Sequence, residues 1–142
     1  MAQHGNINGV KEASGNIAAF ARTKALCGEG LNFWSGNDSD TVPMMALGAK
    51  GVVSVASNIV PDVVSRLCAL CADGDFTAAA ALNEAYMDLF HILFCEVNPI
   101  PVKTAMALLG RCGGELRLPL VPMGAAHRDV LIACLAGHGI IM

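Results

Sequence analysis

Three short apolar runs, each followed by a helix-like segment, set the strongest constraint on how this chain can fold. The runs are Ile7 to Val10, Leu31 to Trp34 and Gly51 to Val55. The last of them, GVVSV, is rich in β-branched residues and lacks a regular alternation of apolar and polar positions. Strands that read as continuous apolar runs are buried on both faces, as in parallel sheets covered by helices. The first half of the chain therefore predicts a β-α-β-α-β arrangement in an α/β fold.

The segments between these runs carry signals for the start and end of helices. Asn16 is placed to cap a helix from Ile17 to about Leu26, and Gly28 is placed to end it. Residues 40–47 predict a second helix that ends at Gly48. Each of these helices would return the chain to the start of the next strand, as parallel pairing requires.

Beyond Ser57 the pattern becomes helical. Helices are predicted over residues 61–72, 76–95, 102–109 and 124–135. The segment Asn98-Pro99-Ile100-Pro101 separates the second of these helices from the third, because proline removes a hydrogen-bond donor and disfavours the α conformation of the residue before it. We therefore expect two units, residues 1–74 and residues 75–142, of which the second is an antiparallel helical cluster.

The composition is unusually apolar for a chain of this size. Of its 142 residues, 54% belong to the set AVILMFWYC and only 15% are charged, whereas about 25% are charged in an average soluble domain. A small domain has a large surface for its volume and should be more polar than average. The sequence therefore has the composition of a protein interior whose covering is incomplete.

Charge and run length argue against several partners and locations. With 9 Lys and Arg against 12 Asp and Glu, the net charge of -3 offers no basic surface to nucleic acid or to an anionic membrane. No apolar run reaches the roughly 18 to 20 residues of a spanning helix, and the opening MAQHGNING lacks the apolar core of a signal peptide. We therefore expect a cytoplasmic protein without nucleic-acid or membrane partners, in which the 6 cysteines are reduced.

Lys11 is the most interesting candidate for chemistry. It ends a predicted apolar strand and is followed by Glu12 to Asn16, a turn of mostly small residues that leads into a helix. In parallel α/β folds the carboxyl ends of the strands display functional groups. A lysine among apolar strand residues can act there as an amine nucleophile toward a carbonyl. The alternative, which position alone favours, is a solvated lysine at the end of a strand.

The other candidate sites have ordinary structural explanations. The turn Ser35-Gly36-Asn37-Asp38 could bind an anion through backbone amides, but most such turns are simple connections. Cys68 and Cys71 have the spacing of a zinc or redox pair, yet they lie inside a predicted helix, and no second pair follows at finger-like spacing. His91 lies within an apolar predicted helix and is interpreted as a core or interface residue rather than a ligand. His4, His127 and His138 are scattered and have no partner nearby in sequence. We predict no metal, and a Cys/His metal-binding module is the weakest functional alternative.

Four stretches occur in an order that is typical of one enzyme family. They are GVKEASGN (9–16), SGND (35–38), GVVSVASN (51–58) and NPIPVK (98–103). Through them the chain resembles the later half of the dihydrodipicolinate synthase (4-hydroxy-tetrahydrodipicolinate synthase) family, and the resemblance continues through RLPL (117–120). The NPIPVK stretch favours this family over related pyruvate aldolases such as N-acetylneuraminate lyase.

The resemblance implies a (β/α)8 TIM barrel followed by a C-terminal helical domain. The three apolar runs would be barrel strands six, seven and eight, so residues 1–74 would form the C-terminal part of the barrel and residues 75–142 the helical domain. The five preceding strands have no counterpart in this sequence. Three strands would leave two open sheet edges and an uncovered apolar face, so we expect the chain to self-associate or aggregate.

The resemblance also implies a chemistry and a set of site residues. Lys11 matches the lysine that forms a Schiff base with pyruvate, Val53 matches a position whose backbone contacts the bound pyruvate, and Gly36 matches a glycine that lines the same pocket. The family condenses pyruvate with aspartate semialdehyde in lysine and diaminopimelate biosynthesis. No metal and no separate cofactor are implied beyond the covalent pyruvate imine on Lys11.

Several functional groups of the family have no match in this chain. These are a glycine-rich Thr/Glu loop, a proton-relaying tyrosine and an arginine for the aldehyde substrate, and Tyr86, the single tyrosine, lies in a predicted helix of the second unit. Since positioned acid and base groups contribute about 10²- to 10⁴-fold each, we expect little activity from the chain alone. A second copy, or a complementing N-terminal half, is the expected protein partner. The alternative function is a non-catalytic remnant that serves as an interaction or oligomerisation module.

Overall fold

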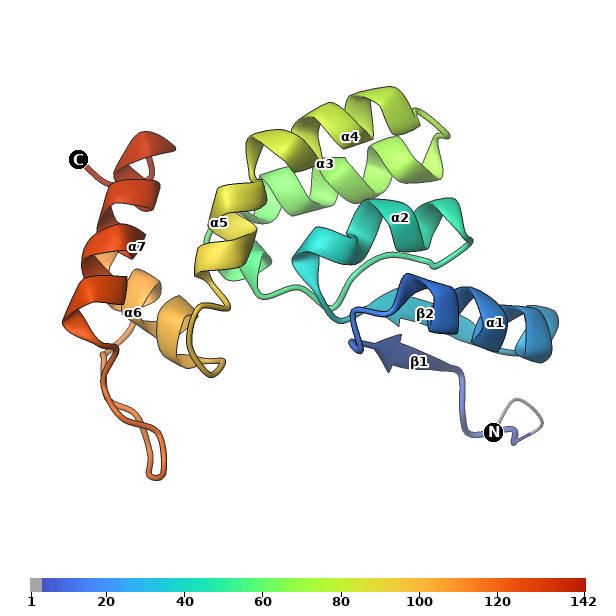
Figure 1. The fold of residues 1–142 in the computed structure, drawn as a ribbon, viewed down its shortest axis with the longest axis horizontal. Coiled ribbons are helices and arrows are strands. Elements are labelled where there is room, and N and C mark those ends of the chain that lie inside the picture. The colour runs from blue at the N-terminus through green and yellow to red at the C-terminus, as the bar shows by residue number, and fades with distance from the viewer. Residues whose placement is uncertain (1–3) are drawn as a thin grey trace.

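A two-stranded parallel sheet forms one end of the molecule, and helices form the rest (Figure 1). The computed structural model describes residues 4–142. Strands β1 (Gly9–Glu12) and β2 (Asn32–Ser35) pair in parallel, with Lys11 opposite Trp34. Helix α1 (Ile17–Cys27) connects them. The predicted β-α-β start is therefore confirmed, with each strand displaced toward the C-terminus by one or two residues.

The ends of α1 are set by the two residues that the sequence identifies. The side chain of Asn16 accepts a hydrogen bond of 2.9 Å from the backbone N–H of Ala19, which satisfies one of the free donors at the start of the helix. Gly28 follows the last turn with a φ of 56°, a conformation that glycine adopts without strain. The helix is fastened to the sheet by Phe20, whose ring lies edge-on to that of Phe33 with the ring centres 5.5 Å apart.

The third predicted strand, residues 51–55, is a single bridge rather than a strand. Its contact with the sheet is an isolated parallel bridge to Ser35. The bridge lies at Val52, and beyond it the backbone amides of Val55 and Ala56 donate to the carboxylate of Asp38. Because these amides are taken by a side chain, they cannot extend the ladder, and the chain turns into a short 3-10 helix. The prediction of a full strand here was wrong.

The remaining elements are helices. In chain order they are η1 (Gly28–Gly30), η2 (Asp38–Asp40), α2 (Thr41–Ala46), η3 (Ala56–Asn58), α3 (Pro61–Ala72), α4 (Phe76–Ala85), α5 (Met87–Ile92), α6 (Ile100–Leu108) and α7 (Ala125–Gly137). Helix α3 has the predicted bounds, and Pro61 occupies its first turn, where a missing N–H costs nothing. Helices α3 and α4 pack against each other, and α7 packs against both α5 and α6.

The helix predicted over residues 76–95 is instead two helices that meet at Tyr86. The backbone of Tyr86 leaves the helical region, with φ -117° and ψ 9°. No proline or glycine marks this position, so the sequence carries no breaking signal. The break redirects the chain from α4, which packs on α3, to α5, which packs on α7. Tertiary packing is therefore the cause of the break.

Helix α6 begins two residues earlier than predicted. Its first residue is Ile100, so Pro101 lies in the first turn instead of before the helix. Proline is tolerated there because the amides of the first turn have no partner within the helix. The predicted break between the preceding helix and α6 is still present, since α5 ends at Ile92.

The buried side chains form two cores. The smaller core lies between α1, β2 and α2 and consists of Phe20, Leu31, Phe33, Met44 and Ala49. The larger core runs from Val55 to Leu135 and includes buried residues of α3, α4, α5, α6 and α7. It therefore contains side chains from both sides of position 74, and the division into units 1–74 and 75–142 stays a prediction.

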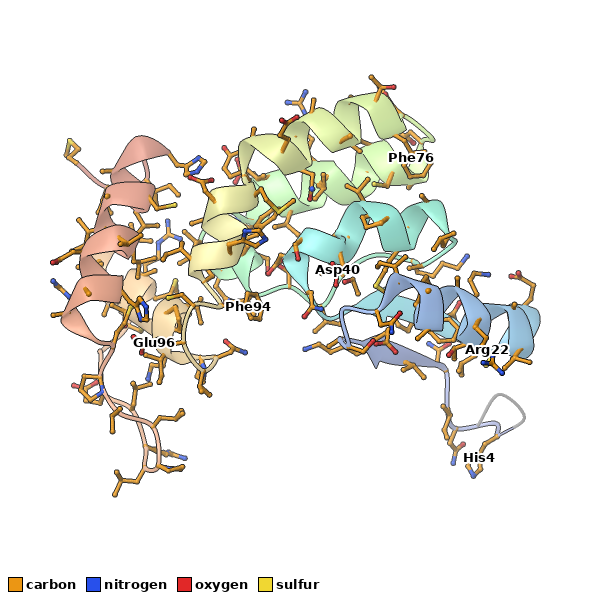
Figure 2. The ribbon with its side chains drawn as sticks, in the orientation of Figure 1. His4, Arg22, Asp40, Phe76, Phe94 and Glu96 are labelled. Carbon is orange, nitrogen blue, oxygen red and sulfur yellow. The ribbon has the colours of Figure 1, made fainter. Side chains whose placement is uncertain are left out.

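Several large apolar side chains are exposed. Leu118 is 88% exposed, Leu26 79% and Val97 67%. Phe94, just beyond the end of α5, is 39% exposed (Figure 2). Scattered exposed apolar residues are normal on protein surfaces, so the expected self-association stays a prediction. Within residues 4–142, none of the helices has the length and apolar character needed to cross a bilayer.

Candidate functional site

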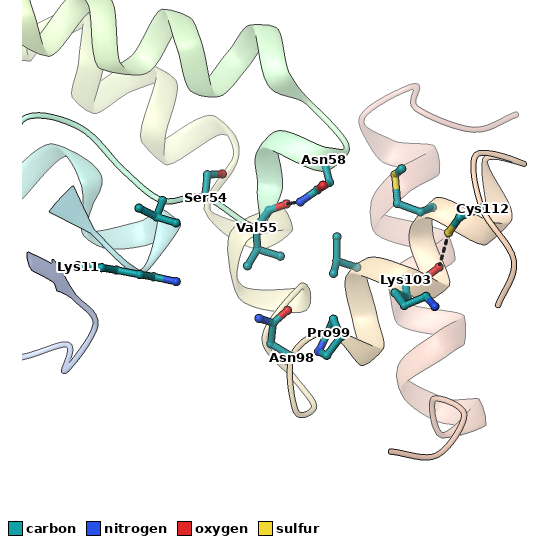
Figure 3. Close-up of a pocket in the computed structure, with 11 residues that line it drawn as sticks. Lys11, Ser54, Val55, Asn58, Asn98, Pro99, Lys103 and Cys112 are labelled. Atoms are coloured by element: carbon teal, nitrogen blue, oxygen red, sulfur yellow. Dashed lines mark hydrogen bonds between the residues drawn. The ribbon is translucent and has the colours of Figure 1, made fainter. Parts of the chain in front are cut away.

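A cavity of ≈ 440 Å³ separates β1 from the start of α6 (Figure 3). Its wall includes two of the three site residues that the sequence analysis named, Lys11 and Val53. The other lining residues come from the segment around η3, from α6 and from the chain that flanks α6: Ser54, Val55, Asn58, Asn98, Pro99, Val102, Lys103, Met106 and Cys112. The topology therefore brings residues that lie far apart in sequence into one site.

Lys11 projects from the carboxyl-terminal half of β1. Its side chain extends toward Val55 and the start of α6 (Figure 3). It is the exposed residue of β1, whereas its neighbours Val10 and Glu12 are partly buried. Two interpretations of Lys11 were open, a lysine among apolar strand residues and a solvated lysine at the end of a strand, and position alone favoured the second. In the structure, the amine is open to the cavity and to solvent.

Gly36 follows β2 directly and lies against the side chain of Lys11. Its backbone N–H donates a hydrogen bond of 2.7 Å to the carbonyl oxygen of Glu12. A Cβ atom at this position would lie 2.5 Å from the Cβ of Ala13 and 2.9 Å from the Cε of Lys11. Gly36 is not part of the cavity wall, but the absence of a side chain there leaves the space that Lys11 occupies.

Val53 belongs to the cavity wall on the segment that follows the bridge to β2. Its backbone N–H donates a hydrogen bond of 2.8 Å to the carbonyl oxygen of Ser35. The side chain is 47% exposed. This hydrogen bond fixes the backbone of Val53 relative to β2 and therefore relative to the other strand residues of the site.

The carboxylate of Asp38 holds the loop that carries Ser54 and Val55. Asp38 is only 2% exposed. One carboxylate oxygen accepts hydrogen bonds of 3.0 Å each from the backbone amides of Val55 and Ala56, and the other accepts the hydroxyl of Ser54. Buried charges persist where they are hydrogen-bonded in this way. Asp38 is therefore a positioning residue for one wall of the cavity, whereas the sequence suggested only a turn.

The opposite wall is formed by residues that were not among the predicted site residues. Asn98, Pro99 and Lys103 lie at the start of α6, within the NPIPVK stretch that carried part of the resemblance. The ammonium group of Lys103 donates a hydrogen bond of 2.6 Å to the carbonyl oxygen of Glu115. Together with Lys11 it gives the cavity two positive charges, which suits a small carboxylate-bearing molecule. Only the topology shows that α6 faces β1.

Cys68 and Cys71 lie on α3 and behave as structural thiols. Burial raises the pKa of both thiols. The thiolate is the reactive and metal-binding form of cysteine, so a raised pKa makes these side chains less reactive. Cys71 is also part of the larger core. The interpretation of this pair as packing residues is therefore supported, with Cys71 buried and Cys68 partly buried.

Two histidines have partners that sequence position did not reveal. His127 is paired with Glu96 at 2.7 Å, and His138 is paired with Asp88 at 2.9 Å. Each partner lies on the chain before α6, more than thirty residues away in sequence. His91 is exposed on α5, so a core position for it was wrong.

A parallel β-α-β unit that presents a lysine to a cavity beyond the strand ends has the arrangement of an α/β enzyme. The model of the dihydrodipicolinate synthetase family matches residues 1–137. The chain therefore belongs to the dihydrodipicolinate synthetase family.

Curated relatives agree with this assignment. A 4-hydroxy-tetrahydrodipicolinate synthase of Sulfurihydrogenibium sp. is 46% identical over 137 residues, which are 96% of this chain and 47% of the relative. One from Pelobacter propionicus is 43% identical over 141 residues, which are 99% of this chain and 49% of the relative. The chain thus spans about half the length of the curated relatives it matches.

Solved structures give the same result for the fold. A dihydrodipicolinate synthase from Aquifex aeolicus matches with a TM-score of 0.94 and 42% identity, over 98% of this chain and 47% of that chain. The chloride-inhibited dihydrodipicolinate synthase from Acinetobacter baumannii, complexed with pyruvate, also has a TM-score of 0.94, with 37% identity over 99% of this chain and 48% of that chain. The chain therefore matches part of the fold of these TIM-barrel enzymes.

Proposed function

We propose that this chain carries the Schiff-base lysine of a 4-hydroxy-tetrahydrodipicolinate synthase, and that Lys11 is that lysine. The observation that carries the proposal is the position of Lys11 at the end of a parallel strand, in the wall of a cavity with a second cationic residue, Lys103. Membership of the family supports a pyruvate-dependent lyase. It favours this function over a non-catalytic interaction module.

The proposed reaction begins on the ketone of pyruvate. Lys11 first gives its ammonium proton to solvent, and its free amine then attacks the carbonyl carbon; loss of water gives an imine. The imine draws electrons from the adjacent methyl group, which loses a proton to give an enamine. The enamine carbon then attacks the aldehyde carbon of aspartate semialdehyde. Attack of that substrate's own amine on the imine carbon closes the ring and returns Lys11 as a free amine.

Three further residues have proposed roles around Lys11. Gly36 leaves room for the lysine side chain, because a Cβ there would lie 2.9 Å from its Cε. The backbone of Val53, fixed by its hydrogen bond to Ser35, contacts the bound pyruvate. Lys103 supplies positive charge for a substrate carboxylate. The imine is formed by protein and substrate alone, and no metal or separate cofactor is invoked.

The same proposal places the chain within the complete fold of its family. β1, β2 and the segment at Val52 correspond to strands six, seven and eight of a (β/α)8 barrel. Residues 1–74 then belong to the barrel and residues 75–142 to the helical domain. The family's Thr/Glu loop, relay tyrosine and substrate arginine have no match in this sequence. We therefore expect the 142 residues alone to form the imine with pyruvate but to catalyse the complete reaction slowly. The expected location is the cytoplasm, and the expected protein partner is a second copy or a complementing half.

Exchange of the methyl protons of pyruvate in heavy water tests this proposal without the second substrate. Enamine formation replaces these protons with deuterium, which NMR follows directly. We expect the wild-type chain to accelerate the exchange and Lys11→Arg to abolish the acceleration. Lys50→Arg is the matched control, since Lys50 is exposed and lies outside the cavity wall. Exchange at the wild-type rate in Lys11→Arg, or no acceleration by the wild type, would contradict the proposal.

A further inference from the structure

Three side chains with metal-binding atoms meet where α5 packs against α7. Asp88 comes from the first turn of α5, Cys134 from α7, and His138 from the residue that ends α7. One ligand atom from each lies within 4.8 Å of the other two. We propose that Asp88, Cys134 and His138 form a binding site for a divalent transition-metal ion of the zinc class.

The hydrogen bonds of the cluster already place the donor atoms around a common centre. The Nε2 atom of His138 lies 2.9 Å from Oδ1 of Asp88. The thiol of Cys134 donates a hydrogen bond of 3.5 Å to the other carboxylate oxygen of Asp88. A metal ion would replace both hydrogen bonds, and the thiol proton would leave to solvent. Burial and the neighbouring carboxylate of Asp88 raise the pKa of Cys134 to about 11, so it is the bound metal ion that would have to displace this proton. The ligand atoms already lie within 4.8 Å of one another.

The donor set selects the class of ion. One thiolate sulfur, one imidazole nitrogen and one carboxylate oxygen are ligands of Zn²⁺ and related ions, whereas Mg²⁺ and Ca²⁺ prefer oxygen alone. Three protein ligands leave one tetrahedral position open to water or to a small ligand. The carboxylate side of the site can accept that water, since the side chain of Asp88 is 65% exposed.

The surrounding residues hold the imidazole in place. The ring of Tyr86 stacks on the ring of His138, with the ring centres 4.7 Å apart and the planes at 18°. The side chain of His138 is only 15% exposed. Buried Leu89 on α5 and Leu135 on α7 belong to the larger core that fixes the two helices against each other. A ligand whose orientation is fixed in this way loses less conformational freedom when it binds a metal.

A cavity of ≈ 400 Å³ adjoins the cluster and offers further donors. Asp88 and Cys134 line it together with His91 and Cys95, which lie on the same helical segment and just beyond it. None of the three proposed ligands lines the cavity of Lys11. The proposed metal site therefore does not depend on the Schiff-base chemistry, and the failure of one proposal leaves the other intact.

Cobalt(II) is a suitable probe, because a thiolate ligand gives Co²⁺ an intense charge-transfer absorption in the near ultraviolet. We expect the full 142-residue chain, kept reduced, to develop this band and to saturate at one ion per chain, with Zn²⁺ displacing the cobalt. Cys134→Ser should abolish the band. Asp88→Asn and His138→Gln should each weaken binding by about tenfold or more.

Two control variants separate a built site from general affinity of the surface. Cys112→Ser removes an exposed thiol outside the cluster. His127→Gln removes the histidine of a second His–carboxylate pair, which among residues 4–142 has no third metal-binding side chain close to it. Both variants should bind cobalt as the wild type does. A band that survives Cys134→Ser, or an equal loss in a control variant, would overturn the proposal.

A second measurement uses the wild type alone and so does not depend on the folding of any variant. The raised pKa of Cys134, about 11, slows its alkylation, so the reaction with iodoacetamide is run until Cys134 of the metal-free chain is alkylated, as located by peptide mass mapping. Saturating Zn²⁺ should then protect Cys134, while the exposed Cys112 reacts at an unchanged rate. Equal alkylation of Cys134 with and without zinc would overturn the proposal even if cobalt binds elsewhere.

Discussion

The buried carboxylate of Asp38 accepts a hydrogen bond of 3.0 Å from the backbone N–H of Val55, although the two residues lie 17 positions apart. Val55 is part of the cavity that also contains Lys11. The same carboxylate oxygen accepts the amide of Ala56, and the other oxygen accepts the hydroxyl of Ser54. The stability of the fold and the shape of the cavity therefore depend on one side chain.

Asp38→Asn should destabilise the chain. The amide group of asparagine presents a donor where Asp38 now has an acceptor, so at least one of the three donors around it loses its partner. Removing one member of a buried, charge-assisted network lowers the free energy of unfolding by about 2 to 4 kcal/mol. Urea denaturation measures the change. Asp129→Asn, at an exposed position on α7, should change it by less than about 0.5 kcal/mol, and equal effects of the two substitutions would contradict the account.

Gly36→Ala should impair both the fold and Lys11. The new Cβ would lie 2.5 Å from the Cβ of Ala13 and 2.9 Å from the Cε of Lys11, so the backbone around Ala13 or Gly36 must shift and the lysine side chain must also move. Overpacking of this kind lowers the free energy of unfolding by about 1 to 3 kcal/mol. We also expect slower deuterium exchange into pyruvate. Gly114→Ala is the control, because its Cβ would meet its nearest neighbour, the Cβ of Ala107, at 3.8 Å. If Gly36→Ala keeps the wild-type free energy of unfolding and the wild-type rate of deuterium exchange into pyruvate, the close packing of Gly36 against Ala13 and Lys11 is unimportant.

Glu96 should make the stability of the helical half depend on pH. Its carboxylate is hydrogen-bonded to the ring of His127 and to the backbone amide of Gly124, and these bonds lower the pKa of Glu96 below its ordinary value of 4.5. A carboxylate with a lowered pKa stabilises the fold above its ordinary pKa, and this stabilisation is lost as the pH falls through the lowered value.

The comparison of wild type with Glu96→Gln isolates this contribution. Urea midpoints measured from about pH 6 down to about pH 3 should differ most at the upper end and converge at the lower end. If the difference in urea midpoint between the two proteins stays constant over this range, the ionised carboxylate of Glu96 does not stabilise the fold. Glu84→Gln, at an exposed position on α4, should show no such convergence.

Local signals in the sequence predicted the structure correctly where interactions between residues close in sequence determine it. Asn16 and Gly28 bound α1 as predicted, and Pro61 begins α3 as predicted, because caps and proline act within one turn of the helix. The parallel start of the fold was predicted for the same reason, since its apolar runs are separated by a clear helix.

Distant contacts decide the features that the sequence analysis missed. Residues 51–55 have the composition of a strand, yet Asp38 binds the amides that would extend the ladder. The helix break at Tyr86 has no local cause and follows from packing on α7. In the site, Lys11 could be singled out as a strand-end lysine, whereas Lys103 and Asn98 are brought to it only by the placement of α6.

Trapping of the imine with borohydride, followed by peptide mass mapping, tests the central claim most directly. The chain has lysines at positions 11, 24, 50 and 103, so the site of reduction distinguishes the cavity from the surface. The account predicts that pyruvate is fixed on Lys11 and that Lys11→Arg carries no adduct. An adduct distributed over Lys24, Lys50 and Lys103, or no adduct under conditions that fully trap a complete relative, would contradict it.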